Sequence, residues 1–348
     1  MTESILVLTH ADESGNALTK ASLEAVTAGV EISARLEAPL TIGIVAVDAT
    51  KAAGVLAATG ARLLSVQGET FAQARYASDA AACEAICCAA AATIVLAPAS
   101  SRFARVAAGV AHRLGGFIDT HITSIGGTAQ DGTEQVEASR WFYRQRIEAT
   151  ISREARPWIL LLDAGIHEAF AGAPGTVAVE QVPVELPDVR TTVKGLRSPA
   201  QDAQTIRPDA HLLFVAGAGW TKKQADGQTH AGEAGEIILD FLRTTGASLG
   251  SSKSLVDQGG DGQPVLPFLT HMNQIGQTGS TPRHAKGLAT CCHGEEPHVV
   301  GWRFIGERRA ISLDPNCGWT RGKADVVYIA DAFKVMERVN ALLLAKDV

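Results

Sequence analysis

The sequence lacks any long uncharged apolar run and any cluster of basic residues. No apolar stretch in its 348 residues reaches the roughly 18 residues that a membrane-spanning helix needs, so we do not expect an integral membrane protein. Its 31 lysines and arginines stand against 37 acidic residues, and this balance gives no reason to expect a nucleic-acid partner. The start, Met1-Thr2-Glu3-Ser4, lacks the basic segment of a secretory signal, and we expect a cytoplasmic protein.

Cysteines at the spacing of a metal site are missing as well. None of the six cysteines forms a Cys-x-x-Cys pair, which argues against zinc and iron–sulfur sites. We expect them to be small buried apolar residues, at positions 83, 87, 88, 291, 292 and 317. The histidines at positions 271, 284, 293 and 298 have no helix-borne ligand spacing, so hydrogen-bonded or solvated side chains are favoured over a metal site.

The first half of the chain alternates short apolar runs with helical patterns. The apolar runs are continuous, which is typical of parallel strands covered on both faces. They lie at residues 4–9, 40–47, 62–66 and 93–97, and the helical patterns lie at 21–34, 52–58, 77–91 and 102–114. Residues 122–125, 136–143 and 147–151 predict an antiparallel or mixed extension of the sheet, and a further strand follows at 158–163.

The length of 348 residues predicts about two domains. Residues 174–197 are extended and are broken by Pro183, Pro187 and Gly195, so we place the boundary there. The predicted domains are residues 1–197, an N-terminal α/β domain with a mostly parallel sheet, and residues 198–348, a C-terminal doubly wound, Rossmann-like domain.

The second half restarts the α/β pattern. Strands are expected at 211–216 and 325–329, helices at 235–244 and 332–344, and either a helix or a strand at 284–289. Further segments of the pattern lie at 247–252, 299–305 and 309–313. We expect a loop from residue 253 to Gln258-Gly259-Gly260.

Glycine-containing turns follow several of these predicted strands. Gly217-Ala218-Gly219-Trp220 starts like a dinucleotide fingerprint but lacks its third glycine. The run Gln274-Ile275-Gly276-Gln277-Thr278-Gly279-Ser280 combines glycines, which let a backbone approach an anion, with a hydroxyl that both donates and accepts hydrogen bonds. Turns that follow parallel strands lie together at the carboxyl edge of the sheet. We therefore predict that five of these turns converge on one crevice and form a nucleotide or flavin site. They lie at 217–219, 252–253, 276–279, 293–298 and 312–314.

The same residues resemble the alpha subunit of electron transfer flavoprotein. Ile275-Gly276-Gln277-Thr278-Gly279 stands in the place of the family's VGQTG motif, and the similarity runs without a gap to Asp314. Gly250 to Asp257 and Asp325 to Phe333 also resemble family segments, whereas the first half agrees more loosely, at 5–10, 21–28 and 94–99. The resemblance spans essentially the whole chain.

The resemblance implies FAD, held largely by the C-terminal domain, and a beta subunit that closes over it and packs on the N-terminal domain. In the family the loop threonine, here Thr278, lies near the flavin N5, a basic residue, here Lys253, lies by the ring, and a histidine, here His298, lies near O2. Carried over residue by residue, the implied cofactor-binding residues are Gly219, Ser252, Lys253, Ile275, Gly276, Gln277, Thr278, Gly279, His293, Gly294, Glu295, Glu296, Pro297, His298, Ser312, Asp314, Asp331 and Ala332.

The implied function is that of a heterodimeric electron carrier without substrate turnover of its own, and we find no nucleophile elbow or other catalytic constellation. Such a carrier takes electrons from a flavin-dependent dehydrogenase to an acceptor such as electron transfer flavoprotein–quinone oxidoreductase. The family also allows AMP in the partner beta subunit.

Several residues depart from the family pattern and keep two alternatives open. Lys253 and Gly219 replace family arginines, Ser312 replaces an asparagine, and Glu295 and Glu296 add negative charge near the expected flavin. These changes leave room for a flavin-free structural subunit that scaffolds a beta-like subunit. A nicotinamide- or nucleotide-dependent enzyme on the same type of domain is the third reading, and it rests on fold alone.

Overall fold

The chain divides into two compact units, Met1–Leu196 and Arg197–Val348. The structure, a computed structural model, describes residues 3–12, 14–130, 133–143, 145, 147–188, 190–195, 206–207, 210–257, 264–276, 281–290, 304–315, 317 and 324–345. Both units are α/β, each around its own sheet, and the predicted fold class is confirmed.

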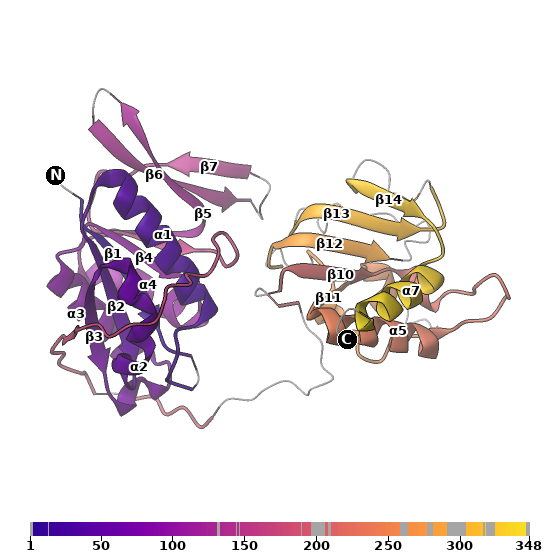
Figure 1. Ribbon diagram of the computed structural model, residues 1–348, viewed down its shortest axis with the longest axis horizontal. Coiled ribbons are helices and arrows are strands. Elements are labelled where there is room, and N and C mark those ends of the chain that lie inside the picture. The colour runs from indigo at the N-terminus through magenta and orange to yellow at the C-terminus, as the bar shows by residue number, and fades with distance from the viewer. Residues whose placement is uncertain are drawn as a thin grey trace. The chain divides into compact units, whose positions relative to one another are not determined.

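The first unit contains a nine-stranded sheet in the order β7-β6-β5-β8-β4-β1-β2-β3-β9 (Figure 1). All pairings from β5 through β8, β4, β1, β2 and β3 to β9 are parallel. Strands β5, β6 and β7 pair antiparallel, which confirms the predicted extension. The strands are β1 Ile5–His10, β2 Leu40–Ala46, β3 Arg62–Gln67, β4 Ile94–Pro98, β5 Phe117–Gln130, β6 Thr133–Phe142, β7 Ile147–Ile151, β8 Trp158–Leu162 and β9 Val179–Gln181.

Helices cover both faces of the parallel part of this sheet. Alternate residues of β1 explain the continuous apolar pattern, because Ile5 and Val7 join the core under α1 and α2, whereas Leu6 and Leu8 join the core under α3 and α4. The predicted helix at 52–58 is split into α2 and the 3₁₀ turn η1. The helices are α1 Lys20–Leu36, α2 Ala49–Ala53, η1 Gly54–Thr59, η2 Glu69–Ala72, α3 Tyr76–Ala90 and α4 Ser101–Arg113.

The second unit contains a five-stranded parallel sheet in the order β11-β10-β12-β13-β14. Counted along the chain, this order is 2-1-3-4-5, the flavodoxin-like doubly wound arrangement. Helices α5 and α7 pack together against one face of the sheet (Figure 1). The elements are β10 Leu212–Ala216, η3 Ala218–Thr221, α5 Ala231–Thr245, β11 Ser248–Ser251, α6 Lys253–Asp257, η5 His271–Asn273, β12 His284–Thr290, β13 Ile305–Ser312, β14 Val326–Ile329 and α7 Ala332–Leu344.

Three local predictions for the second half are corrected or decided by the structure. The loop expected after Ser252 is wrong over Lys253–Asp257, which forms helix α6, because the Ser252 hydroxyl accepts the Leu255 N–H and caps it. Residues 284–289 form a strand, and the segment at 309–313 lies, up to Ser312, in the longer strand β13.

The cysteines largely follow the prediction of burial. Cys83, Cys87 and Cys317 are buried, and burial raises the pKa of the Cys87 thiol to about 12. The prediction is wrong for Cys88, which is exposed on the outer side of α3, and the cysteines at positions 291 and 292 lie outside the described residues. Among the described residues, no helix has the length and apolar character to cross a membrane.

Candidate functional site

The carboxyl edge of the five-stranded sheet is the place where this fold binds ligands. Strand β10 has β11 on one side and β12 on the other, so the strand order reverses at β10, and sheets of this kind bind ligands outside the carboxyl ends of the strands at that point, here β10 and β12. The predicted site residues that the structure describes follow or end the strands at this edge: Gly219 follows β10, Ser252 follows β11, Ser312 ends β13, and Asp331 follows β14.

Ser252 and Lys253 form the start of helix α6 at this edge. The Ser252 side chain is largely buried, and its hydroxyl, which caps the helix, still has a proton to donate. The Lys253 side chain is 51% exposed, and its ammonium lies 3.8 Å from the Asp257 carboxylate one turn along the helix. This loose pair leaves the positive charge accessible at the edge of the sheet.

Ile275 and Gly276 anchor the glycine loop. The Ile275 side chain belongs to the core, and its N–H donates to the Ser251 carbonyl at 3.2 Å. A Cβ on Gly250 would lie 2.6 Å from Ile275 Cδ1, so a larger residue there would displace the buried Ile275 side chain. Gly276 has φ +78°, and its N–H donates to Thr281 Oγ1 at 2.7 Å, which ties together the two ends of the Gln277–Ser280 segment.

Ser312 and Asp331 form turns at the carboxyl ends of β13 and β14. The Ser312 hydroxyl exchanges hydrogen bonds with the backbone of Asp314, at 3.2 Å in each direction. Asp331 caps helix α7 by accepting the Phe333 N–H at 2.9 Å, and Ala332 is buried in the core behind it. The edge therefore carries hydroxyl and carboxylate groups held in defined turns.

The other predicted site residues lie outside the described residues. They are Gln277, Thr278 and Gly279 of the glycine loop, and His293, Gly294, Glu295, Glu296, Pro297 and His298. Of the two remaining histidines considered for a metal, His284 is hydrogen-bonded to the Pro282 and Arg207 carbonyls, and His271 lies 3.7 Å from the Asp257 carboxylate.

A buried tryptophan that the sequence patterns did not single out connects the two strands beside the crevice. The Trp220 indole N–H donates to Thr290 Oγ1 at 2.8 Å, and the Thr290 hydroxyl donates to the Val215 carbonyl at 3.1 Å. The Trp220 ring also packs against Phe333, with 4.6 Å between the ring centroids. Trp220 therefore fixes the loop after β10 to the end of β12 and to the start of α7.

The groups at this edge fit a polar cofactor with hydroxyl and phosphate groups. The Ser251 hydroxyl is buried at the end of β11 and has no hydrogen-bond partner among the described residues, so it is available to a ligand. The Ser252 hydroxyl donates, and the Lys253 ammonium supplies positive charge. Unlike the glycines of a full dinucleotide fingerprint, Gly219 is buried within the 3₁₀ turn η3, and helix α5 begins only at Ala231.

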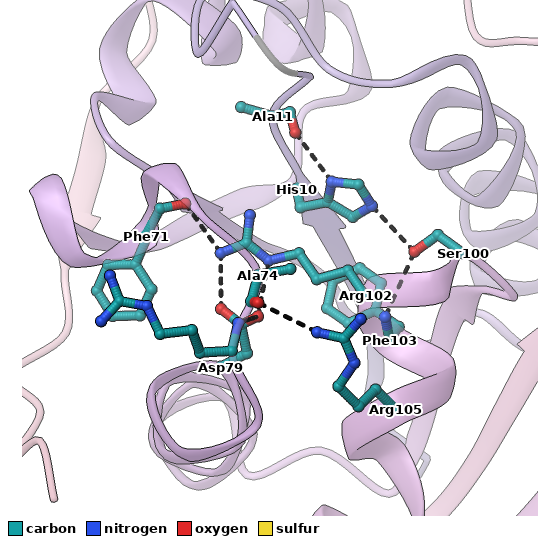
Figure 2. Close-up of polar contacts among 10 residues, drawn as sticks. His10, Ala11, Phe71, Ala74, Asp79, Ser100, Arg102, Phe103 and Arg105 are labelled. Atoms are coloured by element: carbon teal, nitrogen blue, oxygen red, sulfur yellow. Dashed lines mark hydrogen bonds and ion pairs between the residues drawn. The ribbon is translucent and has the colours of Figure 1, made fainter. Parts of the chain in front are cut away.

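A second polar cluster lies in the first unit, at the carboxyl ends of β1 and β4 (Figure 2). His10 Nδ1 faces the Ala11 carbonyl at 2.9 Å and so carries the proton, which leaves Nε2 to accept from the Ser100 hydroxyl at 3.0 Å. Burial lowers the pKa of His10, in keeping with a neutral ring. Next to it, the Arg102 guanidinium binds the Asp79 carboxylate at 2.6 and 3.0 Å.

Comparison with protein-family models identifies the first unit. Residues 7–187 match the electron transfer flavoprotein domain, just over half of the chain. The chain belongs to the electron transfer flavoprotein family. A search of curated proteins by sequence found no match. The family match lies wholly within the first unit, and the electron transfer flavoprotein assignment of the chain therefore rests on β1 to β9 and the helices around them.

Proposed function

We propose that this electron transfer flavoprotein family member is the alpha subunit of a heterodimeric carrier, and that its second unit binds FAD at the carboxyl edge of the five-stranded sheet. The observation that carries the proposal is the 2-1-3-4-5 strand order, which has its switch point between β10 and β12. Ser252, Lys253 and the Ile275–Gly276 turn lie at the end of β11, the strand next to β10. The family membership of the first unit supports the same reading.

The residues at this edge have binding and tuning roles in the proposed function. When bound, FAD supplies the redox chemistry of the carrier. The hydroxyls of Ser251 and Ser252 offer hydrogen bonds to polar groups of the cofactor, and the Lys253 ammonium favours negative charge in its vicinity. Trp220 holds the loop after β10 against the end of β12 through its hydrogen bond to Thr290. None of these roles requires a general acid or base.

The proposed partners follow from the family resemblance. A beta subunit, which can itself hold AMP, would complete the heterodimer and cover the flavin. A flavin-dependent dehydrogenase would donate the electrons, and electron transfer flavoprotein–quinone oxidoreductase or a similar acceptor would receive them. We propose that the protein acts in the cytoplasm and has no substrate turnover of its own.

Reconstitution with FAD tests the proposal. The full chain, alone and with its beta subunit, is mixed with excess FAD and freed of unbound flavin by gel filtration. We expect a flavin absorption spectrum that co-elutes with the protein at a ratio of one FAD per chain. A colourless complex would support the flavin-free scaffold instead, and turnover of a nicotinamide cofactor by the isolated chain would support the enzyme reading.

A further inference from the structure

The connection from β10 to α5 contains a small hairpin, residues 223–229. Its two end residues form an antiparallel bridge. Inside it, the Gln224 N–H donates to the Gln228 carbonyl at 2.8 Å, and the Gly227 N–H donates to the Gln224 carbonyl at 2.9 Å. Gly227 has φ +78°, a conformation that glycine adopts without strain. The hairpin is therefore an ordered part of the connection that leaves β10, the strand at which the order of the second sheet reverses.

Two side-chain contacts fasten this hairpin to the rest of the second unit. On one side, Gln224 Nε2 donates to the Gly219 and Lys222 carbonyls, at 3.0 and 2.7 Å. Because amide and carbonyl groups do not titrate, these bonds do not depend on pH. On the other side, Asp226 of the hairpin faces His230, the residue directly before α5, with 2.7 Å between the carboxylate and Nε2 of the ring. This second contact joins two titratable groups.

The His230 ring has a carboxylate at each of its two nitrogens. Nε2 faces Asp226, and Nδ1 lies 3.1 Å from the carboxylate of Glu233, which belongs to the first turn of α5. A neutral imidazole carries a proton on only one nitrogen, so it can donate to only one of these carboxylates, and its other nitrogen would then direct a lone pair at the second. Only the protonated ring can donate in both directions. The geometry therefore fits the positively charged form of His230.

The charges around the ring favour the same form. Among the described residues, the charged groups that face it are Asp226 from the hairpin and Glu233 from α5, and α7 contributes the uncharged ring of Phe333, edge-on at 6.4 Å between the ring centroids. The N-terminal end of α5 opposes a positive charge here, because a helix dipole favours anions at that end. The carboxylates outweigh it, and the hydrogen bond to Asp226 raises the pKa of His230 above its ordinary value of about 6.5.

We propose that His230 is a pH-sensitive switch, which holds the hairpin against the start of α5 when the ring is protonated and releases it as the pH rises. In the released hairpin the ring titrates near its ordinary pKa, so the closed hairpin binds the proton more tightly than the open one. The contact is therefore complete below about pH 6.5 and is lost as the pH rises through the raised pKa of His230. The Gln224 bonds act at every pH, so the release is a local opening of the hairpin.

Hydrogen exchange of the full chain without FAD, measured by mass spectrometry on peptides that contain residues 223–230, tests the proposal. Each rate is divided by that of an unstructured peptide of the same sequence, because amide exchange itself accelerates with pH. Protection of the wild-type hairpin is expected to be about two- to fivefold lower at about pH 8.5 than at about pH 6, the effect of one exposed ion pair. NMR titration of the His230 ring is expected to give a pKa above the ordinary value.

Three variants remove the charge of one partner. His230→Gln is neutral at every pH and is expected to remove the pH dependence of the protection. Asp226→Asn and Glu233→Gln are each expected to reduce it and to lower the pKa of the His230 ring towards its ordinary value. Asp226→Asn keeps an oxygen that can accept the Gln228 N–H, so the turn itself is retained. Asp226 and Glu233 are about half exposed, and their replacement leaves the core of the unit intact.

Two further variants are controls. Gln224→Ala removes the contact that does not titrate, and it should lower the protection by the same factor at both pH values. His271→Gln replaces another exposed histidine, 3.7 Å from the Asp257 carboxylate, and should behave like the wild type. The proposal is wrong if the wild-type hairpin is equally protected at both pH values, or if His230→Gln keeps the pH dependence of the wild type. Because the samples contain no FAD, neither result depends on the proposed FAD site.

Discussion

The hydrogen bond between Trp220 and Thr290 is expected to hold together the two strands beside the proposed FAD crevice. The bond is 2.8 Å long, is fully buried, and joins residues 70 positions apart. The perturbation is a double-mutant cycle of Trp220→Phe and Thr290→Val, because phenylalanine removes the donor and valine removes the acceptor with little change of shape.

The two single changes differ in what they leave behind. Thr290→Val leaves the Trp220 N–H buried without an acceptor, a cost of about 1–3 kcal/mol. Trp220→Phe leaves the Thr290 hydroxyl bonded to the Val215 carbonyl, so its cost is about 1 kcal/mol for the bond and a packing loss against Phe333. The double variant has no orphaned N–H, and we expect it to be about 1–2 kcal/mol more stable than the two single costs predict together.

Hydrogen exchange measured by mass spectrometry is the assay, because the chain has two units and global unfolding is not a single two-state transition. Peptides over β10 and β12 report the local opening free energy, and about 1.4 kcal/mol corresponds to a tenfold change in exchange rate. Thr245→Val, which removes a hydrogen bond within α5, is the control and should be additive with Trp220→Phe. Additivity within about 0.3 kcal/mol for Trp220→Phe and Thr290→Val would refute the proposed coupling.

Three further predictions concern the site and the first unit. Lys253→Gln is expected to lower the reduction potential of bound FAD, measured in a redox titration. The control is Lys286→Gln, which removes an ammonium 4.0 Å from a carboxylate near the other end of the strands and should leave the potential unchanged. Equal potentials for Lys253→Gln and the wild type would exclude a role for Lys253. Asp119→Asn is expected to destabilise the first unit by about 2–3 kcal/mol in urea unfolding, because this buried carboxylate accepts hydrogen bonds from two arginines and a tryptophan. A loss of less than about 0.5 kcal/mol would show that these bonds do not stabilise the unit. Burial lowers the pKa of His10, so the unfolded chain takes up a proton first as the pH falls below about 6.5, and the stability of the first unit should decrease there by at most about 1.4 kcal/mol per pH unit. His10→Gln should remove this component, and an unchanged pH dependence would show that other groups cause it.

The regular elements could be predicted from the sequence because their signals are local. The helix expected at 21–34 is contained in α1, whose start is fixed by the Thr19 cap. Strand β1 was recognisable from its continuous apolar run, since both of its faces are covered. Elements without such a signal were missed. Helix α6 is too short to show a helical period, and the three-residue strand β9 depends on pairing with Leu63–Ser65, more than 110 residues away.

The candidate site was predictable only in part for the same reason. Glycine turns after strands identified the carboxyl edge of the second sheet, because the rule requires only strand order and local turns. The groups that support this edge are joined over long separations, as in the bond from Trp220 to Thr290, and no local pattern indicates them. In the first unit the bond between His10 and Ser100 spans 90 positions, so the polar cluster at the ends of β1 and β4 has no local sequence signal either.

Hydrogen exchange of the full chain with and without FAD tests the central claim most directly. The account predicts that FAD slows exchange at the carboxyl edge of the five-stranded sheet, in peptides that contain residues 217–222, 251–257, 274–281 and 312–315. Peptides of the first unit should exchange as before. Slower exchange confined to the first unit, or no change anywhere in the chain, would contradict the claim that the second unit is the FAD site.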